Sequence, residues 1–365
     1  VVAAGCYVQA QENSDKIDEC IDIVIGNNKK QNLIEILEEY EQKRKEADGV
    51  FVQQEVIDIN HTKEYEELHL TKTAEHTRAY IKVQDGCNQF CTYCIIPYMR
   101  GRVRSRRKEE VVEEVSALAA NGYKEVVLTG IHLSSYGVDF EEKETLLSLI
   151  QAVHAIEGIE RIRLGSLEPR IITEEFASAL SALPKICPHF HLSLQSGCDA
   201  TLARMNRKYD SSRYYESVQF LHEVYDRPAI TTDLIVGFPG ETEDEFQQTL
   251  DFIQKCGFAA MHIFPYSRRP GTPAAKMPGQ VPNAIKEDRA HRAAEIAQNM
   301  EHAYLDSFVG QTVPVLFEEE RDGVWLGHTI RYCQVGVTST ESLHNQLRQV
   351  RLTGREGSQL TGELV

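Results

Sequence analysis

The sequence predicts an α/β protein built around a partial barrel of six strand–helix units. Six strand-like runs alternate with helical patterns between residues 79 and 266, at the spacing of roughly 30–40 residues that is typical of parallel βαβ units. Residues 307–365 change to short β-type runs separated by turn residues, which predicts a small all-β barrel. We therefore expect three domains, at 1–70, 71–306 and 307–365.

The first 70 residues carry a smaller α/β pattern of their own. Strands are predicted at 1–5 and 21–26 and an acidic helix at 32–47, with a polar linker near 60–76. A strand that opens the chain needs neighbours in a parallel sheet, and the chain does not begin with Met. We therefore expect this sequence to be the remnant of a longer N-terminal domain, with further residues upstream of Val1.

The central domain is expected to hold parallel strands whose carboxyl ends share one rim, as in β/α barrels. Six such units make an incomplete barrel or an open sheet. The predicted strands are 79–83, 125–130, 161–166, 189–195, 229–237 and 259–266. Helical patterns at 109–122 and 242–257 each end in glycine, as helices often do. A long helix at 283–309 then leads to β-type runs at 312–318, 324–330 and 349–354.

The formal net charge of −16 argues against nonspecific nucleic-acid binding by the chain as a whole. The acidity is uneven, however. Residues 1–70 hold 7 Lys and Arg against 16 Asp and Glu, so they carry −9 and the remaining residues only −7. The overall charge therefore leaves room for a local basic surface and an RNA partner.

Nine cysteines are an odd number, which fits a disulfide framework poorly. The chain shows no secretion signal and no apolar run approaching the roughly 18 residues that span a membrane. Clustered cysteines in such a chain favour metal ligands in a reducing compartment. We expect a cytoplasmic protein without a membrane partner.

Three of the cysteines fall within eight residues, just after the first strand of the central domain: Cys87, Cys91 and Cys94. Three thiolates can hold three irons of a 4Fe–4S cluster and leave the fourth iron open to an outside ligand. A structural zinc site is an alternative, but it needs four ligands, and this loop offers no fourth Cys or His. A second alternative is three unrelated buried cysteines.

This CxxxCxxC spacing after the first strand resembles the radical S-adenosylmethionine (SAM) superfamily. The resemblance implies that Cys87, Cys91 and Cys94 are the catalytic cluster ligands, and that the open iron is chelated by the amino and carboxylate groups of SAM. An electron from the cluster then splits the sulfonium to give a 5′-deoxyadenosyl radical. The implied fold is the partial (β/α)6 barrel of that superfamily.

Further motifs resemble the methylthiotransferases of this superfamily across nearly the whole chain. They are "GCNQFCTYCIIPYMRGRVRSR", "TTDLIVGFPGETEDEF" and "FPYSRRPGTPAAKM". Within that family, "LTGIHLSSYG" (128–137) is similar to the branch that acts on N6-threonylcarbamoyladenosine beside the tRNA anticodon. The resemblance implies a tRNA methylthiotransferase that modifies C2 of this adenosine. It also implies a low-potential electron donor of flavodoxin or ferredoxin type, and we expect a monomer.

Other functions remain as alternatives. The same chemistry could act on isopentenyladenosine in tRNA or on a ribosomal protein. From different classes, the chain could be an iron–sulfur electron carrier or a non-catalytic RNA-binding protein. An electron carrier needs no array of six β/α units, and an RNA-binding module needs no three-cysteine loop, so each leaves most of the sequence unexplained.

Cys6, in "AAGCYVQ", resembles the last of three cysteines that hold an auxiliary 4Fe–4S cluster in the family's N-terminal domain. Its two partners are expected upstream of Val1, so the resemblance implies two clusters in the intact protein and only the core one complete here. Full sulfur insertion should then fail with this chain alone. The other cysteines are expected to be small core residues: Cys20, Cys187, Cys198, Cys256 and Cys333.

The SAM pocket is expected from loops at the rim. The candidates lie near strand ends, in the loops that follow them or, for Asp233, inside the fifth strand: Tyr93, Thr129, Gly130, Glu168, Gln195, Ser196, Arg207 and Asp233. Asp233 could instead cap a neighbouring loop. Tyr93 could pack on the adenine, as the superfamily's aromatic does, or serve ordinary loop packing. Glu168 could accept bonds from the ribose or the amine, or stand near a helix cap, and Arg207 could meet the cofactor carboxylate.

A basic run follows the cysteines and is expected to bind RNA phosphates. Its members are Arg100, Arg102, Arg104, Arg106, Arg107 and Lys108. The alternative is a solvated surface, although six positive charges without an interleaved acid are unusual in so acidic a chain. Five more arginines could extend this footprint: Arg268, Arg269, Arg331, Arg348 and Arg351.

The C-terminal module resembles the TRAM domain, a small RNA-binding barrel, in the pattern "LGHTIRYCQV…LTGELV". Separately, "GFPGET" (237–242) lacks the Lys-Ser/Thr ending of a phosphate-binding P-loop. A turn into a helix capped near Thr242 explains it better.

Overall fold

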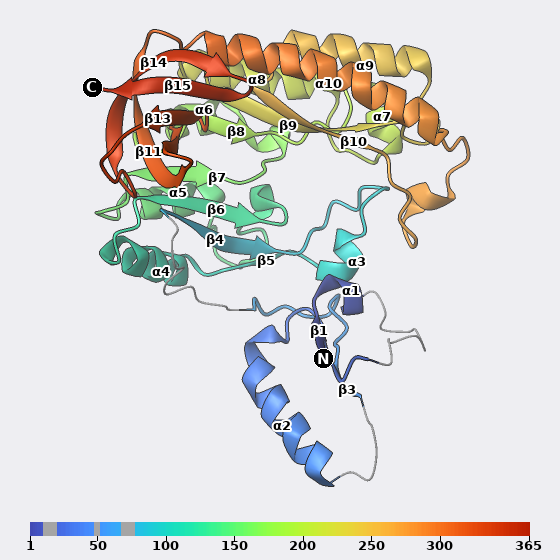
Figure 1. Cartoon of the computed structure of the whole chain (residues 1–365). Helices are drawn as coiled ribbons and strands as arrows, with labels where there is room; N and C mark the ends of the chain where they lie inside the picture. Colours follow the sequence, from blue (N-terminus) through green and yellow to red (C-terminus); the bar gives the residue numbers. More distant parts are fainter. Residues whose placement is uncertain (10–19, 47–51, 67–76) are drawn as a thin grey trace.

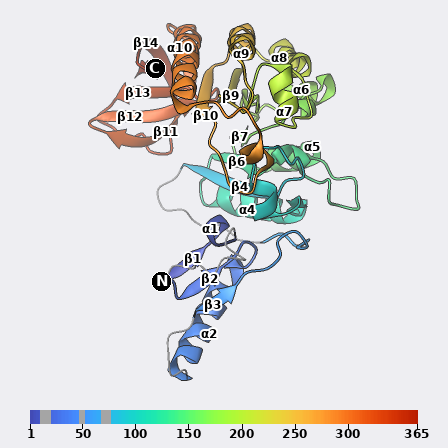
Figure 2. The same ribbon diagram turned by 90° about the vertical axis from the view of Figure 1, so that its right-hand side faces the viewer.

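The computed structural model describes residues 1–9, 20–46, 52–66 and 77–365. These residues form a central α/β core, a small N-terminal α/β piece and a C-terminal β-barrel (Figure 1). The two smaller parts lie on different sides of the core, the N-terminal piece below it in the views of Figures 1 and 2.

The N-terminal piece is a three-stranded parallel sheet with one long helix. Its elements are β1 (Val2–Ala4), α1 (Cys6–Gln9), β2 (Ile23–Ile25), η1 (Lys30–Asn32), α2 (Leu33–Glu46) and β3 (Gln53–Glu55). The sheet order is β1-β2-β3, and the apolar side of α2 packs Ile36 and Tyr40 on Ile23 and Ile25. The predicted strands and helix are present, and β3 has no counterpart among them. Part of the predicted linker (67–76) lies outside the described residues.

The core contains all six predicted strands, each parallel to the next along the chain. The strands are β4 (Arg78–Asp85), β6 (Glu125–Gly130), β7 (Arg161–Leu164), β8 (His189–His191), β9 (Ala229–Val236) and β10 (Ala260–Pro265). Two sheets, ordered β5-β4-β6-β7 and β8-β9-β10, are joined by single parallel bridges, Ile162 to Ile186 and Leu167 to Leu192. The short β5 (Arg104–Ser105) pairs antiparallel with β4 and forms one edge.

The strand predicted at 189–195 ends early, at His191. Gln195 has a φ of 70°, in the left-handed region that an extended strand does not use. Leu192 and Gln195 still make single bridges to their neighbours, so the ladder continues as isolated contacts. The early end turns the chain toward the rim, where the sequence analysis places candidate site residues.

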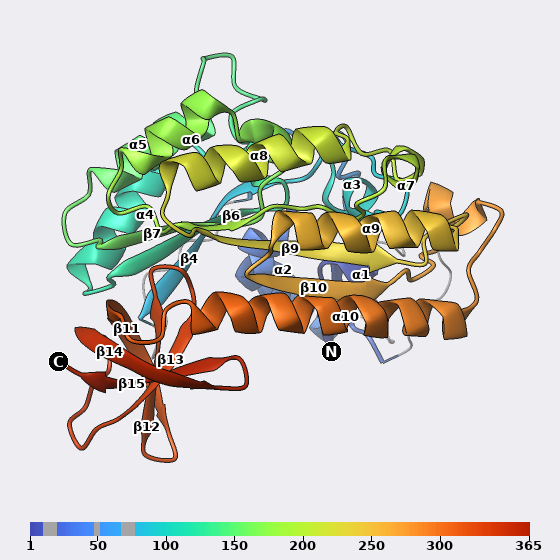
Figure 3. The same cartoon turned by 90° about the horizontal axis from the view of Figure 1, so that it is seen from above.

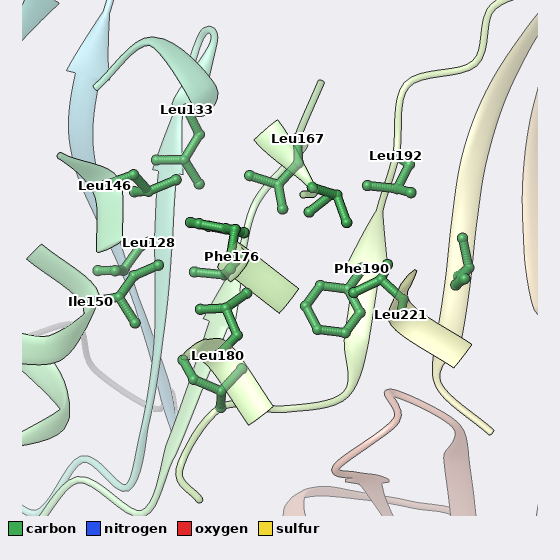
Figure 4. Close-up of a cluster of buried hydrophobic side chains, with 14 of the residues drawn as sticks. Leu128, Leu133, Leu146, Ile150, Leu167, Phe176, Leu180, Phe190, Leu192 and Leu221 are labelled. Carbon is green, nitrogen blue, oxygen red and sulfur yellow. The ribbon is translucent and has the colours of Figure 1, made fainter. Parts of the chain in front are cut away.

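Helices cover the outer side of these strands (Figure 3). They are α4 (Lys108–Ala120), α5 (Leu146–His154), α6 (Glu174–Ser181), α8 (Ser211–Val224), α9 (Glu243–Cys256) and α10 (Asn283–Asp306). Shorter helices stand at strand ends: α3 (Ile96–Arg100), η2 (Leu133–Ser135), η3 (Pro169–Ile171), α7 (Asp199–Arg204) and η4 (Pro273–Lys276). Buried side chains such as Leu128, Ile150, Phe190 and Leu221 fill the layer between strands and helices (Figure 4).

Helix α9 begins and ends as the sequence predicts. The Thr242 hydroxyl accepts a bond from the backbone N–H of Glu245, and the Glu245 carboxylate accepts one from the N–H of Thr242, which is a capping box. Gly257 ends the helix with a φ of 66°, a conformation that costs a glycine little.

The C-terminal part is a closed five-stranded barrel with a core of its own. Its strands are β11 (Thr312–Arg321), β12 (Val324–Thr329), β13 (Gln334–Thr338), β14 (Leu347–Glu356) and β15 (Gln359–Leu364), in the order β11-β12-β13-β15-β14. Phe317, Trp325, Val335 and Val350 are buried inside it. Helix α10 leads into the barrel (Figure 3).

A buried ion network joins this barrel to the first residues of the core strands. Glu125, which is 0% exposed, accepts bonds from Arg78 and Arg163. Arg78 also reaches Glu318 of β11 at 2.8 Å. Arg163 donates to the backbone carbonyl of Thr329 at 2.7 Å.

Arg161 completes the network with bonds to the carbonyls of His328 and Pro314. Burial alone would raise the pKa of Glu125, but the charges and hydrogen bonds of Arg163 and Arg78 lower it to about 2. The carboxylate is therefore ionised and neutralised where it stands.

Tyr332 of the barrel lies at the centre of this contact. Its ring stacks between the rings of His189, at 5.0 Å, and His328, at 4.6 Å. The guanidinium groups of Arg78 and Arg163 lie 5.0 and 4.8 Å from the ring centre. The ring thus contacts cations of the core and aromatic groups from both sides of the interface.

The network lies at the opposite end of the strands from the cysteines. Arg78, Glu125 and Arg161 are the first residues of β4, β6 and β7, whereas the cysteines follow the end of β4. Since neighbouring core strands are parallel, the C-terminal barrel is fixed at one end of the core and the cysteine loop at the other. None of the helices within the described ranges combines the length and apolar character needed to cross a membrane.

Replacing Glu125 by Gln should strongly destabilise the fold, because it leaves buried arginines without their counter-charge. We expect a loss of about 3 kcal/mol or more in the free energy of unfolding, measured by chemical denaturation. Glu160→Gln is the control, because Glu160 is exposed in its ion pair with Lys124. This change should alter the free energy of unfolding by less than about 0.5 kcal/mol. Because the pKa of Glu125 is lowered, its contribution is present above the ordinary value of 4.5 and is lost as the pH falls toward 2. Equal stability of the two variants would contradict this role.

Candidate active site

The cysteine loop starts with a turn that only glycine fits. Gly86 follows β4 with a φ of 71°, and a Cβ built there would lie 1.8 Å from the backbone oxygen of Arg102. The next residue, Cys87, donates its backbone N–H to the carbonyl of Gly101 at 3.0 Å. The start and the end of the loop are therefore held against each other.

The three thiols differ in exposure. Cys87 and Cys91 are buried, and Cys94 is partly exposed just before α3. Burial raises the pKa of Cys87 to about 11. Burial also raises the pKa of Cys94, against the lowering effect of Arg207 and Arg269. The Cys87 and Cys94 thiols are thus protonated near neutral pH, and binding of a metal centre to them would release protons.

The loop supplies soft ligands but no single-ion site. Within the described residues, no three His, Cys, Asp or Glu side chains converge as they would around one metal ion. A cubane cluster makes a different demand, because each thiolate binds a different iron. Three thiols on one loop, next to the partly buried guanidinium of Arg207, fit that donor set.

Segments from far along the chain hold the loop in place. The backbone N–H of Thr92 donates to the carbonyl of Met205 at 3.0 Å, and its carbonyl accepts from Ala274 at 2.9 Å. The Asn206 side chain donates to the carbonyl of Phe90, also at 2.9 Å. Phe90 itself has a φ of 51°, so the backbone bends back between Cys87 and Cys91.

Arg207 brings a fixed positive charge to the thiols. Its Nη1 lies 3.2 Å from the sulfur of Cys91, and its Nε donates to the hydroxyl of Tyr209 at 2.9 Å. The guanidinium carbon of Arg207 lies 4.7 Å from the centre of the Tyr209 ring. The Tyr209 hydroxyl in turn donates to the Leu194 carbonyl at 3.0 Å. Arg207 is thus held from two sides, and it can pair with a thiolate, a cluster or a ligand carboxylate.

The Tyr93 side chain packs against other aromatic and apolar side chains of the protein. Its ring meets the ring of Phe238 edge to face, with centres 6.4 Å apart, in a cluster that includes Met205, Tyr266 and Ala274. This is the ordinary loop packing that stood as the alternative, and the adenine contact remains a prediction.

The ends of β4 and β6 lie side by side at the rim. Gly130 lies so close to Gln84 that a Cβ would meet the Gln84 amide oxygen at 2.8 Å. Thr129 lies beside it with its hydroxyl 3.4 Å from the carbonyl of Ile81. The Gln84 amide oxygen accepts from the backbone N–H of His132 at 2.7 Å, and its nitrogen donates to the carbonyls of Asp85 and Gly86. Gln84 thus ties the start of the cysteine loop to the loop after β6.

Glu168 stands buried in the loop after β7, with Arg170 and His132 as its side-chain partners. Its carboxylate accepts a bond from Arg170 at 2.8 Å and lies 3.5 Å from Nε2 of His132. Burial alone would raise the pKa of Glu168, but these partners lower it to about 2. Its side chain makes no helix-cap bond, so the alternative of a capping role is not what the structure shows.

The candidate residues of the fourth and fifth strands differ in how far they are buried. Ser196 is fully buried, with its hydroxyl 3.3 Å from that of Thr249 in α9. Gln195 bridges to β9 through its backbone. Asp233 is partly exposed and lies 3.3 Å from Nε2 of His191, so it pairs with a neighbouring strand and not with a loop.

Cys6 lies near the helix that follows the cysteine loop. Asn27 connects the two, because its side-chain nitrogen lies 3.5 Å from the Cys6 sulfur and donates to the Met99 carbonyl of α3 at 2.7 Å. Cys187, Cys198, Cys256 and Cys333 are buried, as predicted. Cys20 is exposed, so that prediction is wrong: Cys20 precedes β2 and lies outside its apolar run.

The basic run is largely neutralised by acids from elsewhere in the fold. Arg104 and Arg106 are 1% and 3% exposed, in ion pairs with Asp85 and Glu114. The expectation that all six cations face RNA is therefore wrong for these two. Arg100 lies 3.9 Å from Asp85, Arg107 pairs with Glu142, and Lys108 pairs with Glu144. Arg102 is exposed, with its guanidinium carbon 4.6 Å from the Phe90 ring centre.

Two residues that position the site were missed from the sequence. Gln84 is the buried amide described above, and its only signal was a polar residue near the end of an apolar strand. His132 was noted for its place in a motif, but not for its contact with Glu168.

Gly86→Ala should displace the cysteine loop, because the new Cβ would collide with backbone. We expect most of the iron to be lost after anaerobic reconstitution, measured by iron analysis and visible absorption. Gly122→Ala is a matched control, since Gly122 has a φ of 88° but open space around it. It should cost about 1 kcal/mol of stability and keep its iron. Normal iron in Gly86→Ala would contradict the proposed loop geometry.

Comparison with known proteins identifies the family of the chain. The family model for the radical SAM superfamily matches residues 81–253. The threonylcarbamoyladenosine tRNA methylthiotransferase MtaB of Bacillus subtilis is 36% identical over 357 residues, which cover 96% of this chain and 78% of that protein. The tRNA-2-methylthio-N(6)-dimethylallyladenosine synthase of Thermoanaerobacter sp. is 38% identical over 369 residues, covering 99% of this chain and 76% of that protein.

Among solved structures, the cobalamin-dependent SAM radical enzyme OxsB matches with a TM-score of 0.50 and 13% identity, covering 82% of this chain and 43% of that one. At that identity the match concerns the fold alone. The relatives share most of their length with this chain at well over 30% identity. The chain therefore belongs to the tRNA methylthiotransferase family of radical SAM enzymes.

Proposed function

We propose that this chain adds a methylthio group to C2 of N6-threonylcarbamoyladenosine, next to the anticodon of tRNA. The observation that carries the proposal is the three-thiol loop at the strand ends with the partly buried Arg207 beside Cys91. The substrate is supported by the MtaB proteins of Bacillus subtilis and Aquifex aeolicus, the latter 41% identical over 321 residues.

A second candidate substrate is dimethylallyladenosine in tRNA. Relatives that carry this activity in their names match this chain equally well, at 38% identity over 99% of its length in Thermoanaerobacter. Because the two substrates differ in the group on N6 and not at C2, both are compatible with the same thiol loop.

In this proposal, the residues of the rim have different roles in binding the cluster and the cofactor. Cys87, Cys91 and Cys94 would hold a 4Fe–4S cluster, which with bound SAM supplies the electron and the radical that activate the C–H bond. Arg207 offers a fixed cation for the cofactor carboxylate, and Glu168 an ionised carboxylate for its amine or ribose. Gly130 has no side chain, so the Gln84 side chain can pack against its backbone at the rim.

Tyr93, Thr129, Gln195, Ser196 and Asp233 complete the proposed pocket. Tyr93 reaches the adenine in this proposal only if its ring leaves the edge-to-face contact with Phe238. Ser196 acts indirectly, since its hydroxyl is buried beside Thr249 and accepts a bond from the backbone N–H of Cys198. Asp233 faces the interior with His191.

We further propose that the core is a partial (β/α)6 barrel spanning 71–306, with a TRAM-like RNA-binding module at 307–365. The first is supported by six strands that neighbour one another in chain order, and the second by the closed five-stranded barrel. Residues 1–70 would then be part of an N-terminal domain in which Cys6 binds the auxiliary cluster, close to α3. The proposed partners are tRNA and a low-potential flavodoxin or ferredoxin, acting on a cytoplasmic monomer.

Nucleoside analysis of tRNA tests the substrate directly. Expressed in a Bacillus subtilis strain that lacks its MtaB, the full-length protein should restore 2-methylthio-N6-threonylcarbamoyladenosine, measured by mass spectrometry. Cys91→Ala should restore none, because the cluster would lose one of its three thiolates. Restoration of the methylthiolated dimethylallyl nucleoside instead would favour the second candidate.

Purified protein gives the matching test of the chemistry. After anaerobic reconstitution and reduction, it should convert SAM to 5′-deoxyadenosine, and Cys91→Ala should not. Product from both proteins would show that the thiol loop is not the source of the radical.

A further inference from the structure

One exposed aromatic side chain stands out on the inner side of the core sheet. In β10, Met261 and Ile263 pack against the main hydrophobic core. Since side chains alternate along a strand, His262 and Phe264 point to the other face. Both are exposed, and the Phe264 ring is 51% accessible.

Phe264 stands at an open edge of the core. β10 is the last strand of its sheet, with β9 on one side and no further strand in the described ladder on the other. Its neighbours on β9 in register are Ile235 beside Phe264 and Asp233 beside His262. A planar group entering from this edge would therefore meet the Phe264 ring before reaching the interior candidates.

The segment that follows β10 is basic and carries no acid. Residues 266–282 contain three cations, Arg268, Arg269 and Lys276, and no Asp or Glu, in a chain of net charge −16. All three are exposed, and none forms an ion pair with an acid of the described residues. This contrasts with the run 100–108, where five of six cations lie near or pair with a carboxylate.

This segment, here called the 266–282 loop, rests directly on the cysteine loop. The N–H of Ala274 donates to the Thr92 carbonyl at 2.9 Å, and a Cβ at Gly271 would lie 3.4 Å from Ile95. Figure 1 shows the loop in orange between β10 and α10, at the end of the core where α3 lies. Arg102, beside the Phe90 ring, adds a fourth unpaired cation near the same thiols.

We propose that Phe264 stacks on a base of the anticodon loop while the cations of the 266–282 loop hold the phosphates on either side of it. The proposal rests on the function proposed above and assigns its RNA contact. Unstacked bases of RNA loops are held by aromatic rings, and their backbone by cations. An exposed ring followed within twelve residues by three unpaired cations, at the end of the core that bears the thiols, provides both.

An acidic electron donor is the other macromolecule that such cations could attract. It would use the charges, but it would have no need of the Phe264 ring on the inner face. The carboxylate of Asp233 nearby also opposes an acidic protein surface entering the interior, whereas a stacked base is neutral. RNA is therefore the occupant that accounts for the ring and the cations together.

The test is binding of a synthetic anticodon stem-loop that carries N6-threonylcarbamoyladenosine, followed by fluorescence anisotropy on the reconstituted chain. Phe264→Leu should weaken binding by roughly 5- to 150-fold, and Phe264→Tyr, which keeps the ring, should restore it. Arg269→Gln and Lys276→Gln should each reduce the slope of log affinity against log salt by about 0.7–0.9. Lys45→Gln, on the exposed end of α2, is the matched control and should leave the slope unchanged.

The outcomes separate the two proposals. If the unaltered chain binds no stem-loop at all, the proposed tRNA substrate is overturned along with its contact. If it binds and the Phe264 and loop variants bind equally well, only the assignment of the contact is wrong. If the loop variants bind RNA normally but are reduced more slowly by a flavodoxin-type donor, the loop is a donor-docking surface and the RNA assignment is overturned.

Discussion

The backbone of the cysteine loop is fixed by residues that lie more than a hundred positions further along the chain, and the rest of the site depends on this constraint. The N–H of Thr92 bonds to Met205, the carbonyl of Phe90 accepts from Asn206, and the carbonyl of Thr92 accepts from Ala274. Three thiols must keep a defined spacing to hold three corners of one cluster. Since the loop has no regular secondary structure before α3, that spacing is set by these tertiary bonds.

The same bonds decide which other groups reach the thiols. Arg207 follows Met205 and Asn206 directly, so the residues that hold the loop also place the Arg207 guanidinium beside Cys91. The 266–282 loop is tied to Thr92 through Ala274, which brings its cations to the same place. At the far end of the strands, the buried Glu125 network fixes the C-terminal barrel. A tRNA that contacts both the barrel and the rim would have to extend along the core.

The sequence was sufficient for the core strands and for the ends of some helices, because these are encoded locally. Alternating runs predicted the six core strands, and Thr242 and Gly257 marked the ends of α9.

The sequence was not sufficient to predict which charged side chains pair with one another. Arg104 and Arg106 look unpaired in the sequence because their acids are not adjacent to them. Asp85, the partner of Arg104, lies on the neighbouring strand β4, and Glu114, the partner of Arg106, lies in helix α4. Glu125 looked like an ordinary strand residue, and only the docking of the barrel explains why it is buried. The exposure of Cys20 and the packing of Tyr93 likewise depend on tertiary contacts that no local pattern reports.

The central claim is that three thiolates, and no fourth protein ligand, hold the cluster of the core. Electron paramagnetic resonance of the reduced, reconstituted protein tests it most directly, recorded with and without SAM. The account predicts that SAM changes the spectrum of the unaltered protein, because one iron is free to bind it, and that Arg207→Gln weakens this response while iron content stays the same. A spectrum that SAM leaves unchanged at saturating concentration would show that the cluster has no open iron, and would contradict the account.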